Sequence, residues 1–144
     1  YEICACLVGS EMCIRDSDGT VITSKTTDFL GASSALILNA LKYLAGIKHD
    51  EKLIKPEYIE PIQKLKVKYL GGRNPRLHSD EILIALAMTS VANENAKKAL
   101  EQIPDLKGCQ VHTSVMLSEA DTKTFNRLGV NLTSEPVRSS SKLY

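Results

Sequence analysis

Several features that would indicate a function class are missing from this sequence. No run of apolar residues approaches the roughly 20 that a membrane-spanning helix needs, so we expect no membrane partner. The chain has no HExxH, GxSxG, Walker or GxGxxG motif. It also lacks the HxE and PCxxC pair that marks zinc deaminases. No familiar catalytic signature is therefore present, and whether the chain is an enzyme stays open.

The first 17 residues, YEICACLVGSEMCIRDS, have the pattern of a translated sequencing adapter. The run LVGSEMCIRDS agrees codon by codon with a transposase-type library adapter, and the variable residues before it fall where a sample index would lie. A secretory signal peptide needs a basic start, a longer apolar run and a small-residue cleavage site, and this segment has none of them. We therefore interpret residues 1–17 as non-native and exclude them from the functional argument.

Little cysteine and little net charge remain once that segment is set aside. Three of the four cysteines lie in it, which leaves Cys109. One cysteine excludes an internal disulfide or a multi-cysteine zinc site, and we expect no metal. Without Arg15 and the three acidic residues of the segment, 17 basic and 14 acidic residues remain. A net charge near +3 is too small to indicate a nucleic-acid partner.

The rest of the chain fits one α/β domain over residues 18–136, followed by a loosely ordered serine-rich tail over 137–144. Asp18-Gly19 is a strong hairpin-turn dipeptide, and TVITSKT after it is rich in β-branched residues. A strand is expected there. Its hairpin partner would precede Asp18, where the adapter-like segment stands, so we expect the domain to have lost its first strand.

Apolar spacing predicts helices over 31–47, 62–70, 82–92, 95–103 and 119–128, with strands over 109–117 and 130–135. In the second helix Ile62, Leu65 and Tyr69 should face the core, with three lysines facing water or a partner. The helix ILIALAMTSVA is apolar on almost every side, so it should be buried. The final strand–helix–strand order predicts a parallel crossover, and the fold class is α/β with helices on a small mixed sheet.

The polar segment RNPRLHSDE before that apolar helix is the best candidate for a functional site. Arg73, Asn74, Arg76 and Ser79 are the candidates for binding a carboxylate or phosphate, because arginine grips such groups bidentately and a helix N-terminus offers free N–H groups. His78 could transfer protons near neutral pH. The acidic residues that follow Ser79 favour the alternative, a structural loop whose own carboxylates occupy the helix start.

The other chemistry-bearing residues lie on the strand CQVHTSVML. Cys109 and His112 are three residues apart, so they should point to opposite faces and cannot form a simple pair. A partly buried, hydrogen-bonded strand face explains His112 without a catalytic role. Both residues stay catalytic candidates beside Arg76 and His78. Ser24-Lys25-Thr26 before the first helix is a weaker suggestion of a phosphate site.

Five stretches resemble the C-terminal region of a bacterial family known as domain of unknown function 1846. They are DGTVITSKTTDFLGASSALILNALK, IEPIQKLKVKYLG, NPRLHSDEILIAL, LKGCQVHTSV and LGVNLTSEP. The resemblance implies the last portion of a much longer cytoplasmic protein with no established activity or cofactor. It also implies a three-layer fold similar to the cytidine-deaminase topology. Relatives carry Gly-Lys where this chain has Ser24-Lys25, and a glycine-rich GxGSGK-like segment lies upstream in the family.

Two hypotheses follow from the residues and the resemblance. In the first, this region is a scaffold or assembly domain that packs on the upstream part of its own protein or completes a homo-oligomer. In the second, it contributes to a small-molecule enzyme site shared with that upstream part. Arg76 would then bind an anionic group, His78 would transfer protons, and Cys109 or Ser114 would line the pocket. The sequence favours the first.

Overall fold

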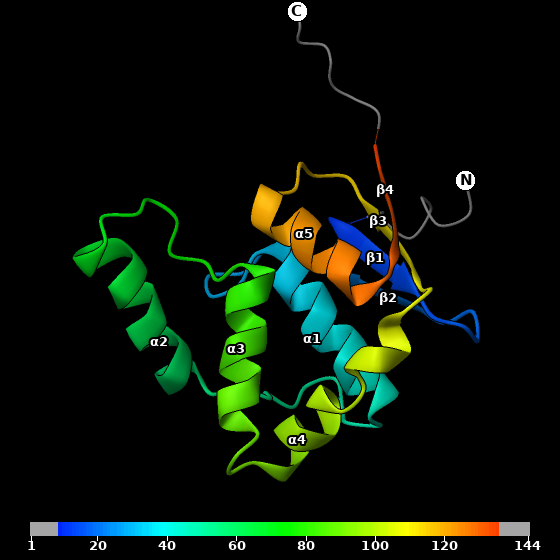
Figure 1. Cartoon of the computed structure of the whole chain (residues 1–144), viewed down its shortest axis with the longest axis horizontal. Coiled ribbons are helices and arrows are strands. Elements are labelled where there is room, and N and C mark those ends of the chain that lie inside the picture. Colours follow the sequence, from blue (N-terminus) through cyan, green and yellow to red (C-terminus); the bar gives the residue numbers. More distant parts are fainter. Residues whose placement is uncertain (1–8, 136–144) are drawn as a thin grey trace, which may run out of the picture.

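A computed structural model of the chain describes residues 9–135 and shows a four-stranded mixed sheet with helices packed against it (Figure 1). The strands are β1 (Met12–Arg15), β2 (Val21–Ser24), β3 (Gln110–Thr113) and β4 (Asn131–Ser134), in the order β2-β1-β3-β4. β1 is antiparallel to both of its neighbours, whereas β4 is parallel to β3. The α/β class and the mixed sheet are therefore confirmed.

The helices are α1 (Ala32–Leu44), α2 (Pro56–Lys64), α3 (Ser79–Thr89), α4 (Glu94–Leu100) and α5 (Glu119–Leu128). A π-helical stretch, Leu65–Tyr69, continues α2, and a short 3₁₀ helix, Ile103–Leu106, follows α4. Helix α5 connects the parallel strands β3 and β4, which confirms the predicted crossover. It begins at Ser118, whose hydroxyl caps the helix, and ends at Gly129 in the left-handed conformation.

Strand β1 lies within the segment interpreted as adapter-derived. It occupies the place of the hairpin partner expected before Asp18, with Arg15 opposite Val21 and Met12 opposite Ser24. The turn residue Gly19 has a φ of +90°, which favours glycine there. The non-native origin of residues 1–17 stays a prediction, and the tail expected over 137–144 lies outside the described residues.

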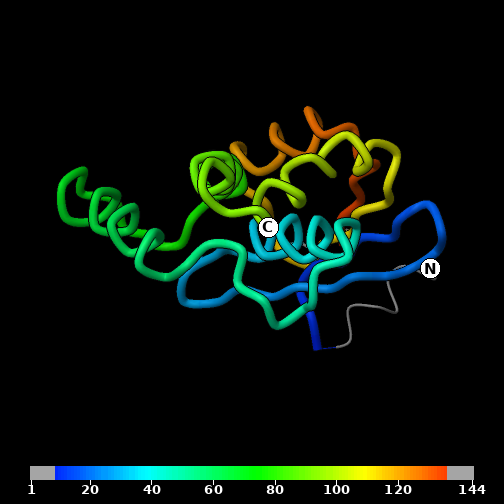
Figure 2. Tube along the Cα trace, turned by 90° about the horizontal axis from the view of Figure 1, so that it is seen from below, coloured from blue at the N-terminus to red at the C-terminus, as the bar shows by residue number. Residues whose placement is uncertain are grey.

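One face of the sheet carries the hydrophobic core. The side-by-side residues Ile22, Ile14, Val111 and Leu132, one from each strand, join a single apolar cluster with buried residues of α1, α3 and α5. The neighbouring row on the opposite face is exposed or half-buried: Val21, Arg15, Gln110 and Asn131. Within residues 9–135 the helices that contact the sheet thus form one layer, and the likeness to the cytidine-deaminase topology is not confirmed (Figure 2).

The second helix differs from the prediction in where it begins. It starts at Pro56, which fits the first helical turn because proline lacks the N–H that would be unpaired there, and Pro61 lies inside it. The buried residue of α2 is Ile59. Leu65 and Tyr69, expected in the core, are exposed, so that expectation was wrong. The backbone hydrogen bond from Leu70 N–H to Leu65 C=O shows the π-helical turn that changes the facing of this end.

Helix α3 is buried on one side only. Ile82, Ala85 and Leu86 are buried, whereas Ile84 and Met88 are 64% and 73% exposed. The expectation of a fully buried helix was therefore wrong within the part of the chain that the structure describes. An apolar pattern on all sides shows that a helix avoids water, but it does not show whether the same domain covers both sides.

Strand β3 is also shorter than predicted, because it ends at Thr113. The Thr113 hydroxyl both donates to Val115 C=O and accepts from Val115 N–H, which turns the chain away from the sheet. None of the helices within residues 9–135 has the length and apolarity required to cross a bilayer.

Candidate functional site

The RNPRLHSDE loop lies at the edge of the sheet where three strands end. β2, β3 and β4 run in the same direction, and their last residues share this edge, because Ser24 and Thr113 both lie opposite Met12. Helices α1 and α5 follow β2 and β3 and begin here. A bridge between Leu30 and Leu77 brings in the loop before α3. In α/β sheets this edge is the usual place for a ligand site.

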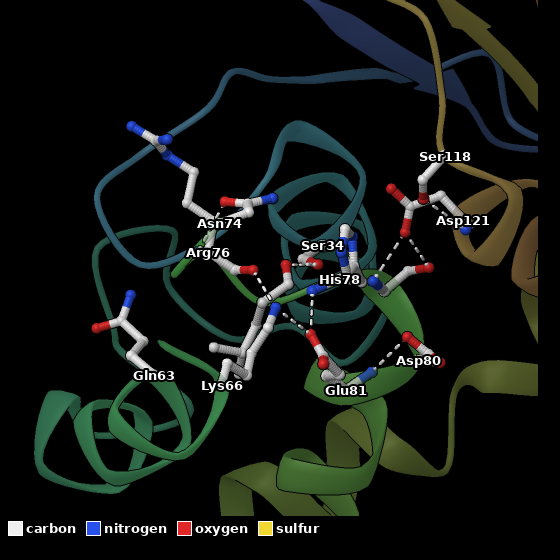
Figure 3. Close-up of polar contacts among 12 residues, drawn as sticks. Ser34, Gln63, Lys66, Asn74, Arg76, His78, Asp80, Glu81, Ser118 and Asp121 are labelled. Carbon is white, nitrogen blue, oxygen red and sulfur yellow. Dashed lines mark hydrogen bonds and ion pairs between the residues drawn. The ribbon is translucent and has the colours of Figure 1, made fainter. Parts of the chain in front are cut away.

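The loop is fixed by polar contacts with its neighbours (Figure 3). Asn74 Oδ1 accepts the Arg76 backbone N–H at 3.1 Å, and Arg76 Nε donates to Thr27 C=O at 2.5 Å. The ammonium of Lys66 donates to Arg76 C=O at 2.6 Å. The Arg73 side chain is exposed and makes no hydrogen bond or ion pair that involves the described residues. The Arg76 guanidinium therefore uses its Nε in a contact within the domain. The Arg73 guanidinium is available to bind a ligand.

Helix α3 begins at Ser79, three residues before the predicted start, and its N-cap is His78. The Glu81 carboxylate accepts the backbone N–H of His78 at 2.7 Å. The same oxygen forms an ion pair with Lys66 at 2.8 Å. Glu81 thus closes the start of α3 and joins it to the end of α2 (Figure 3).

Ser79, predicted to bind an external anion, binds a carboxylate of the chain itself. Both its backbone N–H and its hydroxyl donate to Asp121 Oδ1, at 2.9 and 2.6 Å. Asp121 lies in the first turn of α5 and is buried, and its own N–H donates to the Ser118 hydroxyl. The Ser118 hydroxyl caps α5, but the Asp121 carboxylate reaches across to α3. This contact joins the starts of two helices.

The start of α3 is therefore occupied by three carboxylates of the chain itself, those of Asp80, Glu81 and Asp121. They accept hydrogen bonds from the backbone N–H groups and offset the positive end of the helix dipole, as an external anion would. Among the described residues at this edge, the guanidinium of Arg73 and the terminal nitrogens of Arg76 make no hydrogen bond or ion pair, whereas the imidazole of His78 takes part in a capping box with Glu81. Any anion bound here would rely on those side chains.

Cys109 lies at the opposite end of β3, just before the strand begins. Its side chain is buried in the apolar cluster, and Sγ lies 3.7 Å from Asp105 C=O. Burial raises the pKa of the Cys109 thiol. A protonated, buried thiol is a poor nucleophile, so the structure gives this residue a packing role.

His112 is buried on the face of β3 opposite Cys109, which confirms the predicted opposite orientation. Its Nδ1 lies 2.6 Å from the Thr133 hydroxyl, and its Nε2 lies 2.8 Å from Glu135 Oε2. Both ring nitrogens are thus occupied by groups of β4 and the residue after it. The geometry therefore supports the non-catalytic alternative for His112, a partly buried strand face satisfied by hydrogen bonds.

The four catalytic candidates do not form one site. Arg76 and His78 are neighbours at the carboxyl edge of the sheet. Ser114 also lies at this edge, where its hydroxyl donates to Glu11 C=O at 3.2 Å. Cys109 precedes the strand at the other edge and His112 points to the other face. The structure therefore brings together only part of the predicted set.

Sequence reasoning missed three residues that organise this edge. Lys66 was placed on a solvated helix face, yet it joins α2 to the loop and to α3. Ser34, fully buried in α1, donates its hydroxyl to Leu77 C=O at 2.7 Å. Asp121 joins the start of α5 to Ser79 of α3. No local pattern could identify these roles, because each contact joins residues of different elements.

A cavity of about 700 Å³ lies away from this loop, between β2, α1 and the segment before α2. Ser24 and Lys25 are among its lining residues. The Ser24 hydroxyl is buried and donates to Ala32 C=O at 2.7 Å, so it is not free to bind a phosphate. Within residues 9–135 no cluster of three or more His, Cys, Asp or Glu side chains could hold a metal ion.

Comparison with known proteins identifies relatives over most of the chain. The UPF0371 protein of Corynebacterium efficiens is 52% identical over 127 residues, which are 88% of this chain and 26% of that protein. The UPF0371 protein of Streptococcus uberis is 48% identical over 127 residues, with 88% and 26% covered. That of Streptococcus thermophilus is 43% identical over 136 residues, with 94% and 28% covered. This chain thus spans about a quarter of the length of these relatives.

A family model described as "Domain of unknown function DUF1846, C-terminal" matches residues 7–144. The match includes part of the adapter-like segment and all of the strands and helices described above. It confirms the resemblance drawn from the five sequence stretches. The chain belongs to the family of the DUF1846 C-terminal domain.

Proposed function

We propose that this chain is the assembly domain of a longer cytoplasmic protein, and that it packs through the outer face of α3 against the upstream part of that protein. The domain would position the rest of the protein and would itself carry no complete catalytic site. Nucleic acid is not a partner in this proposal, since the net charge of the chain is only +1.

The observation that carries the proposal is an apolar stripe on the solvent side of α3. Ile84, Met88 and Val91 are 64%, 73% and 88% exposed. Ile84, Ala87 and Met88 lie on one face of α3, and Val91 extends this apolar surface in the turn after the helix. A helix that is apolar on both sides is normally covered on both sides. The body of this domain covers only the side that carries Leu86.

The length of the relatives indicates what covers the other side. They are nearly four times as long as the matched region, and the matching family model is a C-terminal one. An upstream part of the same polypeptide is present at high effective concentration, so it can occupy the stripe without a separate binding event. The stripe contains no charged side chain, which fits a stable intramolecular interface.

Substituting Ile84→Glu together with Met88→Glu tests the proposal in the full-length protein. Each buried apolar side chain contributes about 1.5–3 kcal/mol, so the pair should weaken docking by about 3–6 kcal/mol. Limited proteolysis should then release the C-terminal domain much faster than from the unchanged protein. The 144-residue chain with the same changes should keep its circular dichroism spectrum.

Met116→Glu is the matched control, because this methionine is 98% exposed in the loop after β3 and lies outside the stripe. It should leave the rate of proteolytic release unchanged. Equal release rates for the α3 variant and the unchanged protein would contradict docking through this face.

A second candidate function is a small-molecule site that binds a phosphate or carboxylate at the RNPRLHSDE loop. It is favoured by the position of the loop at the carboxyl edge of β2, β3 and β4. Arg73, Asn74 and Arg76 would hold the anion and His78 would transfer protons, with the upstream part of the protein completing the site. Cys109 and His112 are not included, because they lie at the other edge and on the other face.

Thermal denaturation of the full-length protein with phosphate, sugar phosphates and carboxylic acids tests this candidate. A ligand at 100 times its Kd should add about 2.7 kcal/mol of stability. Arg73→Ala should abolish that gain without changing the midpoint of the free protein, since the exposed Arg73 side chain makes no hydrogen bond or ion pair with the described residues. Arg76→Ala should change both, because Arg76 also binds Thr27 C=O. No gain with any anion would count against this site.

A further inference from the structure

Helix α2 and its π-helical continuation form an arm, residues 56–69, that projects from the rest of the domain (Figures 1 and 2). Few contacts hold it to the body. Ile59 is buried in the core cluster, Gln63 Nε2 donates to Asp28 C=O, and Lys66 pairs with Glu81. The outer side of the arm faces solvent along its whole length.

An apolar stripe follows this arm. It consists of Tyr58, Ile62, Leu65 and Tyr69, at spacings of four, three and four residues. Tyr58, Leu65 and Tyr69 are exposed, and Ile62 is partly buried at the edge of the core. Tyr58 and Ile62 lie about one turn apart in the α-helical part of the arm, and Leu65 and Tyr69 lie about one turn apart in its π-helical part, where a turn takes more residues. The Lys64 ammonium lies 5.6 Å from the centre of the Tyr69 ring, a cation–π contact that fixes this ring at the end of the stripe.

The charges on the arm are divided between its two halves. Glu57 and Glu60 lie in the first half, and Lys64 and Lys68 lie in the second; all four are exposed. Lys66 is already paired with Glu81 and is not counted. Two such arms laid antiparallel bring the acidic half of each beside the basic half of the other, within the Debye length of about 8 Å at physiological ionic strength. A parallel arrangement would bring like charges together.

We propose that the arm pairs antiparallel with the arm of a second copy of this chain, about a two-fold axis near its middle. A two-fold pair requires a surface complementary to itself, and the stripe with its divided charge meets that requirement. The arm also projects at the side of the molecule remote from β1 and β2 (Figure 1). The pairing is independent of the proposed function, because it uses the arm and not the outer face of α3.

Charge exchange on the arm tests the pairing by analytical ultracentrifugation of the full-length protein over a range of concentrations. Glu57→Lys with Glu60→Lys makes the whole arm basic, and Lys64→Glu with Lys68→Glu makes it acidic. Each variant alone should dimerise at least tenfold more weakly than the unchanged protein. An equimolar mixture of the two should regain dimers, because every half-arm then meets an opposite charge.

Lys97→Glu with Lys98→Glu is the control, as both residues are exposed on α4 and the change in charge equals that of the acidic arm variant. It should leave the dimer constant unchanged. Dimers of unchanged strength in both single-charge variants would overturn the proposal, as would an unchanged protein that is monomeric at every concentration. The Ile84→Glu and Met88→Glu pair should release the domain without affecting the dimer constant, so the two proposals fail separately.

Discussion

Replacement of Asp121 by alanine is expected to destabilise the chain by about 3–6 kcal/mol, because two hydrogen bonds to a charged group are lost and each contributes about 1.5–3 kcal/mol. The Asp121 carboxylate accepts both the N–H and the hydroxyl of Ser79, and Ser79 is fully buried. Alanine leaves both donors without an acceptor in a site that water does not reach. Urea denaturation followed by circular dichroism measures the loss as a shift of the midpoint at constant slope.

Two variants separate this contact from a general effect of charge. Asp121→Asn keeps an acceptor oxygen and should lose clearly less than the alanine variant. Asp80→Ala removes an exposed carboxylate one residue after Ser79, where it accepts only the Glu81 N–H, and should cost about 0.5–1 kcal/mol. A loss below about 1 kcal/mol for Asp121→Ala would show that the starts of α3 and α5 are not held by this carboxylate.

The second large effect concerns the two sides of α3. Leu86→Ala should destabilise the 144-residue chain by about 2–5 kcal/mol, since Leu86 is fully buried in the core. Ile84→Ala, two residues earlier on the same helix, should stay within about 0.5 kcal/mol because Ile84 faces solvent. The same urea titration measures both variants.

The comparison becomes informative in the full-length protein. If the upstream part covers the outer face of α3, Ile84→Ala should lower the free energy of unfolding of the full-length protein, although it does not lower that of the 144-residue chain. Hydrogen exchange of the α3 amides, measured in both contexts, reports where that cost arises. Identical effects of Ile84→Ala in the two contexts would leave the outer face without a partner in its own polypeptide.

The elements that the sequence predicted correctly are those set by local chemistry. The turn at Asp18-Gly19 joins two antiparallel strands, and the segment between β3 and β4 is the predicted helix with a serine cap and a glycine end. Each of these depends on residues close together in the chain. Pro56 and Pro61 could both begin a helix, and local chemistry could not choose between them. Packing of Ile59 on the core accounts for the earlier start.

The sequence identified the RNPRLHSDE loop as the candidate site but did not predict its internal contacts. The loop with Arg73, Asn74, Arg76 and His78 does lie at the carboxyl edge of the sheet. Its closure depends on Asp121, 42 residues after Ser79, and no sequence pattern connects the two. The exposure of α3 could not be predicted either. An apolar sequence pattern reflects burial in the whole protein, and this domain covers only one side of the helix.

The central strand of this sheet, whose place β1 fills here, has a consequence for synthesis on the ribosome. Met12 pairs with Ser24 on one side and with Thr113 on the other, so one edge of β1 waits for a strand made about 100 residues later. At 5–20 residues per second, that wait lasts about 5–20 s. Throughout it, a newly made hairpin presents unpaired backbone groups that can pair with any passing strand. Early binding of a chaperone, or early packing of α1 over the hairpin, would protect the nascent chain until β3 arrives.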